Sequence, residues 1–207
     1  MENAKEKRKL FEDIHLHLLE DEYPSEYLST ILSVPLFGEY PFSMIKNLTK
    51  AEQSPIHHPE GNAWKHTLLV IDEAARRRKD SKDKQVFMWA ALLHDIGKPD
   101  TTRIRKGKIT SYDHDRVGAI MSKEFLLYFN CEEDFIEKVS ALVRYHMHIL
   151  YVVKDLSFGN IEDMKENTDI NELALLSLCD RLGRLTPDKE REEKNIKLFL
   201  NKVQNRR

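Results

Sequence analysis

An apolar helix that ends in a charged pair is the feature that most constrains this fold. Residues 86–93 are apolar throughout, which predicts a helix from about Lys82 to Ile96 that is buried on all sides. His94 and Asp95 follow the apolar run directly. Burying either side chain without a partner costs several kcal/mol. A metal ion that neutralises the carboxylate and binds the imidazole nitrogen is therefore the simplest explanation.

Most of the remaining chain also has helical patterns. Apolar spacing and capping residues predict further helices at residues 5–20, 25–37, 42–48, 62–78, 114–129, 133–150, 169–185 and 187–205. Residues 101–113 are either a small β-hairpin that turns at Gly107 or an exposed basic loop. We expect an all-α protein: a bundle of five core helices over residues 56–185, an N-terminal helical extension over 1–55, and a C-terminal helix over 186–207 packed on the bundle.

Four more candidate ligands lie on the apolar faces of other expected helices, at spacings of three and four residues. They are His66, His114, His146 and Asp180. Taken singly, each histidine could be a hydrogen-bonded core residue, and Asp180 could pair with Arg181 or Arg184. All four lie on the apolar face of their helix, and this common orientation favours a shared metal site.

The other histidines do not fit this pattern. His148 shares a helical face with Arg144 and Tyr145, so we expect it to be displaced from the core face that His146 occupies. The remaining histidines are expected to lie at the surface or to have no role in the site: His15, His17, His57 and His58.

Composition limits the classes of function. The 207 residues carry a formal net charge of −2, so no global basic field predicts nucleic-acid binding. The two cysteines form no Cys-x-x-Cys pair, which favours a reducing compartment and a cytoplasmic protein. The charged N-terminus lacks a signal core, and no run of about 18 apolar residues predicts a membrane span.

The order His, His-Asp, His, His, Asp resembles the HD-domain metal-dependent phosphohydrolase superfamily. The similarity is greatest to the HD domain of bacterial tRNA nucleotidyltransferases, the CCA-adding enzymes. It covers roughly residues 55 to 185, and the stretches that carry it are 58–67, 92–99 and 113–119. In resembling proteins the His-Pro-Glu turn that contains His58 can line the cleft. The resemblance implies a helical HD bundle.

The ligand set admits one or two metal ions. His66, His94, Asp95 and Asp180 would hold one ion and leave positions open for water. His114 and His146 would add a second ion bridged by Asp95, or they would instead position substrate and protonate the leaving group. Histidine and carboxylate ligands suit Mn, Fe, Co, Ni or Zn, and the lack of cysteine ligands argues against a structural zinc site.

The resemblance implies hydrolysis of a phosphomonoester or phosphodiester, on a nucleotide, a 2′,3′-cyclic phosphate or a related small molecule. The expected catalytic residues are Asp95, Lys98 and His114. Lys98, Arg144 and Arg181 are the candidates for binding the substrate phosphate. No membrane or obligate protein partner is evident, and RNA is a further candidate partner.

One alternative is a nucleotide- or RNA-binding HD module with little or no turnover, which the basic segment 103–108 and the cluster at Arg76 favour. Hydrolysis of a signalling nucleotide would need recognition motifs that we do not identify. Residues 1–55 contain neither the Gly-Ser motif nor the Asp-x-Asp pair of a nucleotidyltransferase head. We therefore expect a free-standing HD domain that does not add CCA.

Overall fold

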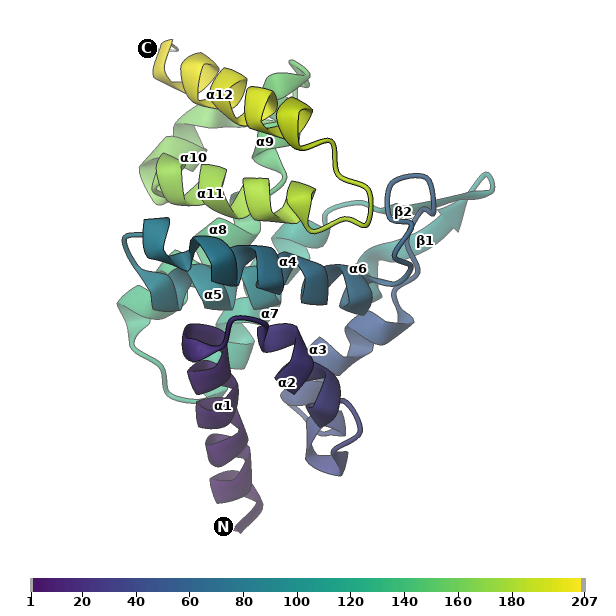
Figure 1. Ribbon diagram of the computed structural model, residues 1–207, viewed down its shortest axis with the longest axis vertical. Helices are drawn as coiled ribbons and strands as arrows, with labels where there is room; N and C mark the ends of the chain where they lie inside the picture. The colour runs from purple at the N-terminus through teal and green to yellow at the C-terminus, as the bar shows by residue number, and fades with distance from the viewer. Residues whose placement is uncertain (1, 206–207) are drawn as a thin grey trace.

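Helices dominate the computed structural model, which describes residues 2–205, so the expected all-α class is confirmed (Figure 1). The α-helices are α1 (Glu2–Glu20), α2 (Pro24–Ile31), α3 (Phe42–Lys46), α4 (Ala63–Arg77), α5 (Lys84–Leu93), α6 (Lys98–Thr101), α7 (His114–Tyr128), α8 (Glu133–Tyr145), α9 (His148–Val153), α10 (Ile161–Asn167), α11 (Ile170–Leu182) and α12 (Lys189–Asn205). The short 3₁₀ helices and strands are η1 (Pro35–Gly38), η2 (Asn47–Lys50), η3 (Arg78–Asp80), β1 (Thr102–Arg105) and β2 (Lys108–Ser111).

The apolar helix α5 forms the centre of the bundle. Every residue from Val86 to Leu93 is buried, and α1, α4, α8 and α11 all pack against this helix. Asp83 caps its N-terminus by accepting hydrogen bonds from two backbone N–H groups of the first turn. Burial on all sides is what the unbroken apolar run predicts, and it fixes the position of the residues that follow Leu93.

The terminal helices lie at opposite ends of the molecule (Figure 1). On α1, Phe11 stacks on Trp89 of α5 with ring centroids 4.7 Å apart. Trp89 Nε1 donates a hydrogen bond to His15 Nδ1, so His15 supports the packing of α1 against α5. At the other end, α12 packs on α9 and α11. The ligand-bearing helices therefore lie between these outer helices.

Two expected helices are shorter than the sequence pattern predicts. The helix expected at 25–37 ends at Ile31, and a 3₁₀ turn follows from Pro35. The helix expected at 133–150 ends at Tyr145, and a new helix, α9, begins at His148. Helical spacing therefore cannot relate His148 to the residues of α8. Helix α10, which Asn160 caps, was not predicted.

The segment between α6 and α7 is a β-hairpin and not an irregular loop. β1 and β2 pair antiparallel, with Arg105 opposite Lys108. The two connecting residues, Lys106 and Gly107, have φ angles of 49° and 73°, as the type I′ turn of a two-residue hairpin requires. Figure 1 shows the hairpin extending from the side of the bundle. Within residues 2–205, no helix is long and apolar enough to cross a membrane.

Candidate metal centre

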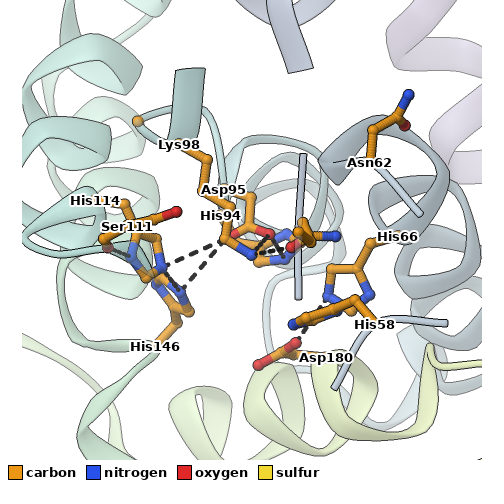
Figure 2. Close-up of polar contacts among 12 residues, drawn as sticks. His58, Asn62, His66, His94, Asp95, Lys98, Ser111, His114, His146 and Asp180 are labelled. Atoms are coloured by element: carbon orange, nitrogen blue, oxygen red, sulfur yellow. Dashed lines mark hydrogen bonds and ion pairs between the residues drawn. The ribbon is translucent and has the colours of Figure 1, made fainter. Parts of the chain in front are cut away.

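The six candidate ligands come together from five helices (Figure 2). His66 lies on α4, His94 and Asp95 follow α5, His114 begins α7, His146 follows α8, and Asp180 lies on α11. Ligand atoms lie within 4.8 Å of one another in three groups of the described residues, one of which joins His66 with His58 and Glu60. Five of the six candidates make up the other two: His66 with His94 and Asp95, and Asp95 with His114 and His146. Asp95 belongs to both of these two groups, so it lies at the middle of the cluster.

A close backbone contact brings the end of α5 to the start of α7. A Cβ atom added to Gly97 would lie 2.3 Å from the carbonyl oxygen of His114 and 2.6 Å from the backbone nitrogen of Gly118. Only glycine allows this approach. As a result, His114 Nε2 lies 3.5 Å from Asp95 Oδ1.

Three of the imidazoles are oriented in the same way. Each places its Nδ1 2.7–2.8 Å from the carbonyl oxygen three residues earlier in the chain; they are His94, His114 and His146. Because a carbonyl oxygen only accepts, Nδ1 carries the hydrogen in each neutral ring, and the Nε2 lone pair is free. Metal-binding histidines are held in this way by their outer-shell partners.

The free nitrogens face one another or face Asp95. His114 Nε2 and His146 Nε2 are 3.2 Å apart, although both rings have their hydrogen on Nδ1. His94 Nε2 is buried and has no hydrogen-bond partner within residues 2–205; it lies 3.3 Å from Asp95 Oδ2. Lone pairs that converge on a buried carboxylate fit a cation. The donor set therefore suits the metal ion that the sequence predicts.

His66 is held by a carboxylate that sequence reasoning missed. Its Nδ1 lies 2.9 Å from Glu60 Oε1, and its Nε2 lies 2.9 Å from Asp180 Oδ1. Glu60 also contacts His58 Nδ1 at 2.9 Å. The His58 side chain is only 15% exposed and packs edge-on against the ring of His66, so the expected surface position is wrong. The signal available in the sequence was the His-Pro-Glu-Gly turn just before α4.

Electrostatics favour an ionised Asp95 and a neutral His146. Burial raises the pKa of Asp95, but the charges of His94 and Lys98 outweigh this effect and hold the pKa well below its usual range. Burial, together with the neighbouring His114 and His94, lowers the pKa of His146 to about 3. A neutral imidazole and a carboxylate are the forms that bind metal ions.

The candidate phosphate-binding residues line one cavity of about 850 Å³ together with Asp95, His114, His146 and Asp180. Lys98 is buried, with Nζ 2.6 Å from Asp95 Oδ2 and a hydrogen bond to Gln53. Arg181 Nε lies 3.9 Å from Asp180 Oδ2.

Arg144 and Arg184 also line this cavity. Arg144 is paired with Asp115. Arg184, for which the sequence predicts only a pairing with Asp180, has a buried Nε without a hydrogen-bond partner in the described chain.

His148 is the clearest departure from expectation. It is buried, at 1% exposure, because the break after Tyr145 starts a new helix and turns the side chain inward. Its ring packs against Tyr145 and Tyr151, with centroids 4.9 Å and 5.5 Å away. It is absent from the three His and acid groups that could hold a metal, so His148 belongs to the cavity wall.

Comparison with known proteins agrees with the geometry. Residues 63–185 match the model of the HD domain. The chain is 32% identical over 113 residues to a multifunctional CCA protein of Actinobacillus pleuropneumoniae (55% of this chain, 26% of that protein). It is 32% identical over 163 residues to a multifunctional CCA protein of Methylococcus capsulatus (77% of this chain, 32% of that protein). It is 30% identical over 125 residues to a CC-adding tRNA nucleotidyltransferase of Thermus thermophilus (55% of this chain, 26% of that protein).

The chain spans 26–32% of the length of these three relatives. Their names describe whole proteins, so the comparison carries over to this chain only for the part that is matched. The residues that the HD domain model matches include all five helices that bring the histidines and carboxylates together, from α4 to α11. On the family match and on this ligand geometry, the chain belongs to the HD domain family.

Proposed function

We propose that this chain is a metal-dependent phosphohydrolase that cleaves the monoester or diester of a nucleotide, a 2′,3′-cyclic phosphate or a related phosphate ester. One observation carries the proposal. Three imidazoles donate Nδ1–H to backbone carbonyls and direct Nε2 toward the shared carboxylate of Asp95. The cavity beside them is lined by lysine and arginine side chains, which suits an anionic substrate.

The ligand set would hold one or two ions. His66, His94, Asp95 and Asp180 would bind the first, and Asp95, His114 and His146 the second. Nitrogen and oxygen ligands suit Mn, Fe, Co, Ni or Zn. When bound, a divalent ion of this kind acts as a Lewis acid on a phosphoryl oxygen and makes water more acidic.

The side chains of the cavity would perform the remaining steps. Lys98 and Arg181 would bind the phosphate, and Arg184 is a third candidate because its Nε lacks a partner in the described chain. Arg144 would support this wall through its ion pair with Asp115. If only one ion binds, His114 Nε2 would first accept a proton from the attacking water and then deliver it to the leaving oxygen, since its Nδ1 is committed to the carbonyl of Ser111.

A metal analysis followed by an activity screen tests the proposal. The purified chain would be loaded with Mn, Fe, Co, Ni or Zn and assayed with a phosphomonoester, a phosphodiester and nucleoside 2′,3′-cyclic phosphates. We expect Asp95→Asn to reduce hydrolysis at least about 100-fold, because it removes the shared carboxylate. Asp188→Asn, on the surface before α12, is the matched control. Equal activity in wild type and Asp95→Asn on every substrate would refute the proposal.

A second candidate function is a nucleotide- or RNA-binding module. The Lys98 ammonium lies 2.6 Å from Asp95 Oδ2, so the chain can neutralise this carboxylate without a metal ion. The exposed basic hairpin would suit RNA. Binding of a nucleotide or RNA that is equally tight with metal and with a chelator, without turnover, would favour this module.

For either function we propose a cytoplasmic location, supported by two free cysteines.

A further inference from the structure

The cavity beside the metal ligands has an aromatic wall that the proposed hydrolysis does not use. Along α9 and the loop that follows it, the cavity is lined by Met147, His148, Tyr151, Leu156 and Phe158. Phe158 is 71% exposed and Leu156 is 39% exposed. Large apolar side chains that gather beside an anion-binding cavity point to a ligand with an apolar part.

The wall is directly connected to the metal centre. His146 follows α8, and α9 begins two residues later with His148. Tyr151 lies one helical turn further along, about 4.5 Å up the axis from His148. The rings form a series, with centroids 5.5 Å apart from His148 to Tyr151 and 5.9 Å apart from Tyr151 to Phe158. A ligand whose phosphate lies at Asp95 would therefore extend along these rings.

The turn that precedes Phe158 is held by its surroundings. After α9, the backbone N–H of Leu156 donates to the carbonyl of Tyr151 at 2.8 Å, and Asp155 has a φ of 51°. This turn brings the chain back over α9. Lys202 of α12 holds the turn by an ion pair with Asp155 at 2.6 Å. These contacts hold the turn just before Phe158, whose ring then contacts Tyr151.

A polar atom in the same wall is left without a partner. His148 Nδ1 is buried and has no hydrogen-bond partner within the described residues. An unpaired buried nitrogen costs about 1–3 kcal/mol. The Tyr151 and Phe158 rings are inclined at 63° to one another. A planar ligand with both an aromatic face and a polar edge would therefore stack on one ring, meet the other edge-on and bond the imidazole. Neither an alkyl chain nor a bare sugar has both features.

We infer that Tyr151, Phe158 and His148 form a nucleobase-binding subsite of the candidate active site. This inference rests on the proposed hydrolysis of a phosphate ester and narrows its substrate to one that carries a base. The base belongs either to a free nucleotide or to the terminal nucleotide of an RNA, since both present the same ring and phosphate.

Removal of the exposed ring tests the subsite with little risk to folding. Phe158→Ala would be compared with Ile120→Ala on α7, whose side chain is 68% exposed and does not line the cavity. The substrates are adenosine 2′,3′-cyclic phosphate and the cyclic phosphate of methyl riboside, which lacks the base. We expect Phe158→Ala to raise KM for the nucleotide about tenfold, as loss of one stacking partner does. In Phe158→Ala, KM for the base-free ester should remain within about twofold of the wild-type value. In Ile120→Ala, KM for both substrates should remain within about twofold of the wild-type values.

Two results would overturn the subsite. One is an unchanged KM for the nucleotide in Phe158→Ala, and the other is an equal loss on the base-free ester. His148→Ala provides a second variant, with thermal unfolding measured in parallel because the side chain is buried. We expect it to weaken adenosine binding while the protein remains folded at the assay temperature. Unchanged adenosine binding by this folded variant would remove His148 from the subsite.

Calorimetric titration with adenosine separates this inference from the proposed function. Adenosine has a base but no phosphate, so its binding does not depend on turnover. Binding that Phe158→Ala weakens, without hydrolysis of any ester, would support the subsite while the phosphohydrolase proposal fails. Hydrolysis that is equally fast with and without the base would refute the subsite while the phosphohydrolase stands.

The two sources of the base are distinguished by substrate length. A short oligoribonucleotide that ends in a 2′,3′-cyclic phosphate would be compared with the mononucleotide. A lower KM for the oligonucleotide, lost when Arg105 and Lys106 of the hairpin are changed to alanine, would assign the subsite to an RNA end. Equal KM values would assign it to a free nucleotide. Either result supports the subsite, because the terminal base is the same group in both ligands.

Discussion

At the residue scale, each ligand depends on a second group that orients it. Backbone carbonyls orient His94, His114 and His146, whereas the carboxylate of Glu60 orients His66. Burial raises the pKa of Glu60, but hydrogen bonds from His66, from its own backbone N–H and from His58 outweigh this and lower the pKa to about 2. Glu60 is therefore ionised at neutral pH and can hold the Nδ1 hydrogen of His66.

We predict that Glu60→Gln weakens metal binding by about 10- to 100-fold, the usual effect of removing an outer-shell partner. The amide keeps the size of the side chain but loses the charge that holds His66. Metal titration followed by calorimetry measures the effect. Glu52→Gln, an exposed residue nearby, is the control. Equal metal affinity in both variants would show that Glu60 has only a packing role.

His146 and His148 provide a second prediction at this scale. His146→Ala should lower the metal-to-protein ratio, because His146 Nε2 lies 3.9 Å from Asp95 Oδ1. His148→Ala should keep the wild-type ratio but unfold at a lower temperature, since it empties a buried position between two tyrosine rings. Elemental analysis and thermal unfolding check both results. Loss of metal in His148→Ala would place His148 among the ligands.

At the element scale, the site is assembled where helices end. Three of the five core helices present their ligands at a terminus: α5 ends before His94, α7 begins at His114, and α8 ends before His146. The chain leaves each helix there, so side chains can turn into the cavity without breaking a helical hydrogen bond. Contacts between helix ends therefore control the geometry more than the helices themselves do.

Gly97→Ala tests the closest of these contacts. Its Cβ would overlap backbone atoms of α7, which cannot move as a flexible side chain can. We expect a loss of about 2–4 kcal/mol in the free energy of unfolding, together with a lower metal affinity. Gly38→Ala is the control, because its Cβ would meet only the Lys46 side chain, at 3.4 Å. Denaturant unfolding of both variants measures the difference, and equal stability would contradict the proposed contact.

At the scale of the whole molecule, the metal centre joins helices that are distant in sequence. His66 on α4 meets Asp180 on α11, which is 114 residues away. A ligand that binds only the folded chain stabilises it by about 2.7 kcal/mol at 100 times its Kd. An ion bound here would therefore connect both halves of the bundle.

We predict that saturating Mn or Ni raises the midpoint of thermal unfolding by about 5–10 °C, and that a chelator reverses the shift. Asp95→Asn should lose the shift, because the carboxylate shared by both ligand groups is gone. Differential scanning calorimetry with and without metal provides the measurement. An equal shift in wild type and Asp95→Asn would mean that the stabilising ion binds elsewhere.

The sequence by itself determined the all-α class, the buried helix α5 and the inward faces of the helices that carry the six candidate ligands. Apolar periodicity indicates which face of a helix is buried. His94 and Asp95 at the end of an apolar run indicate that a partner must compensate the cost of burying them. The assignment of the six residues as ligands stays a prediction. It depends on residue type and spacing, which are local properties.

Only the tertiary structure decided how Glu60 and His58 reach His66, how Lys98 pairs with Asp95, and how His148 becomes buried. These contacts depend on loop paths and helix ends, where the period of 3.6 residues no longer applies. The break after Tyr145 illustrates the limit: one irregular turn changed the surroundings of His148, and helical spacing could not reveal it.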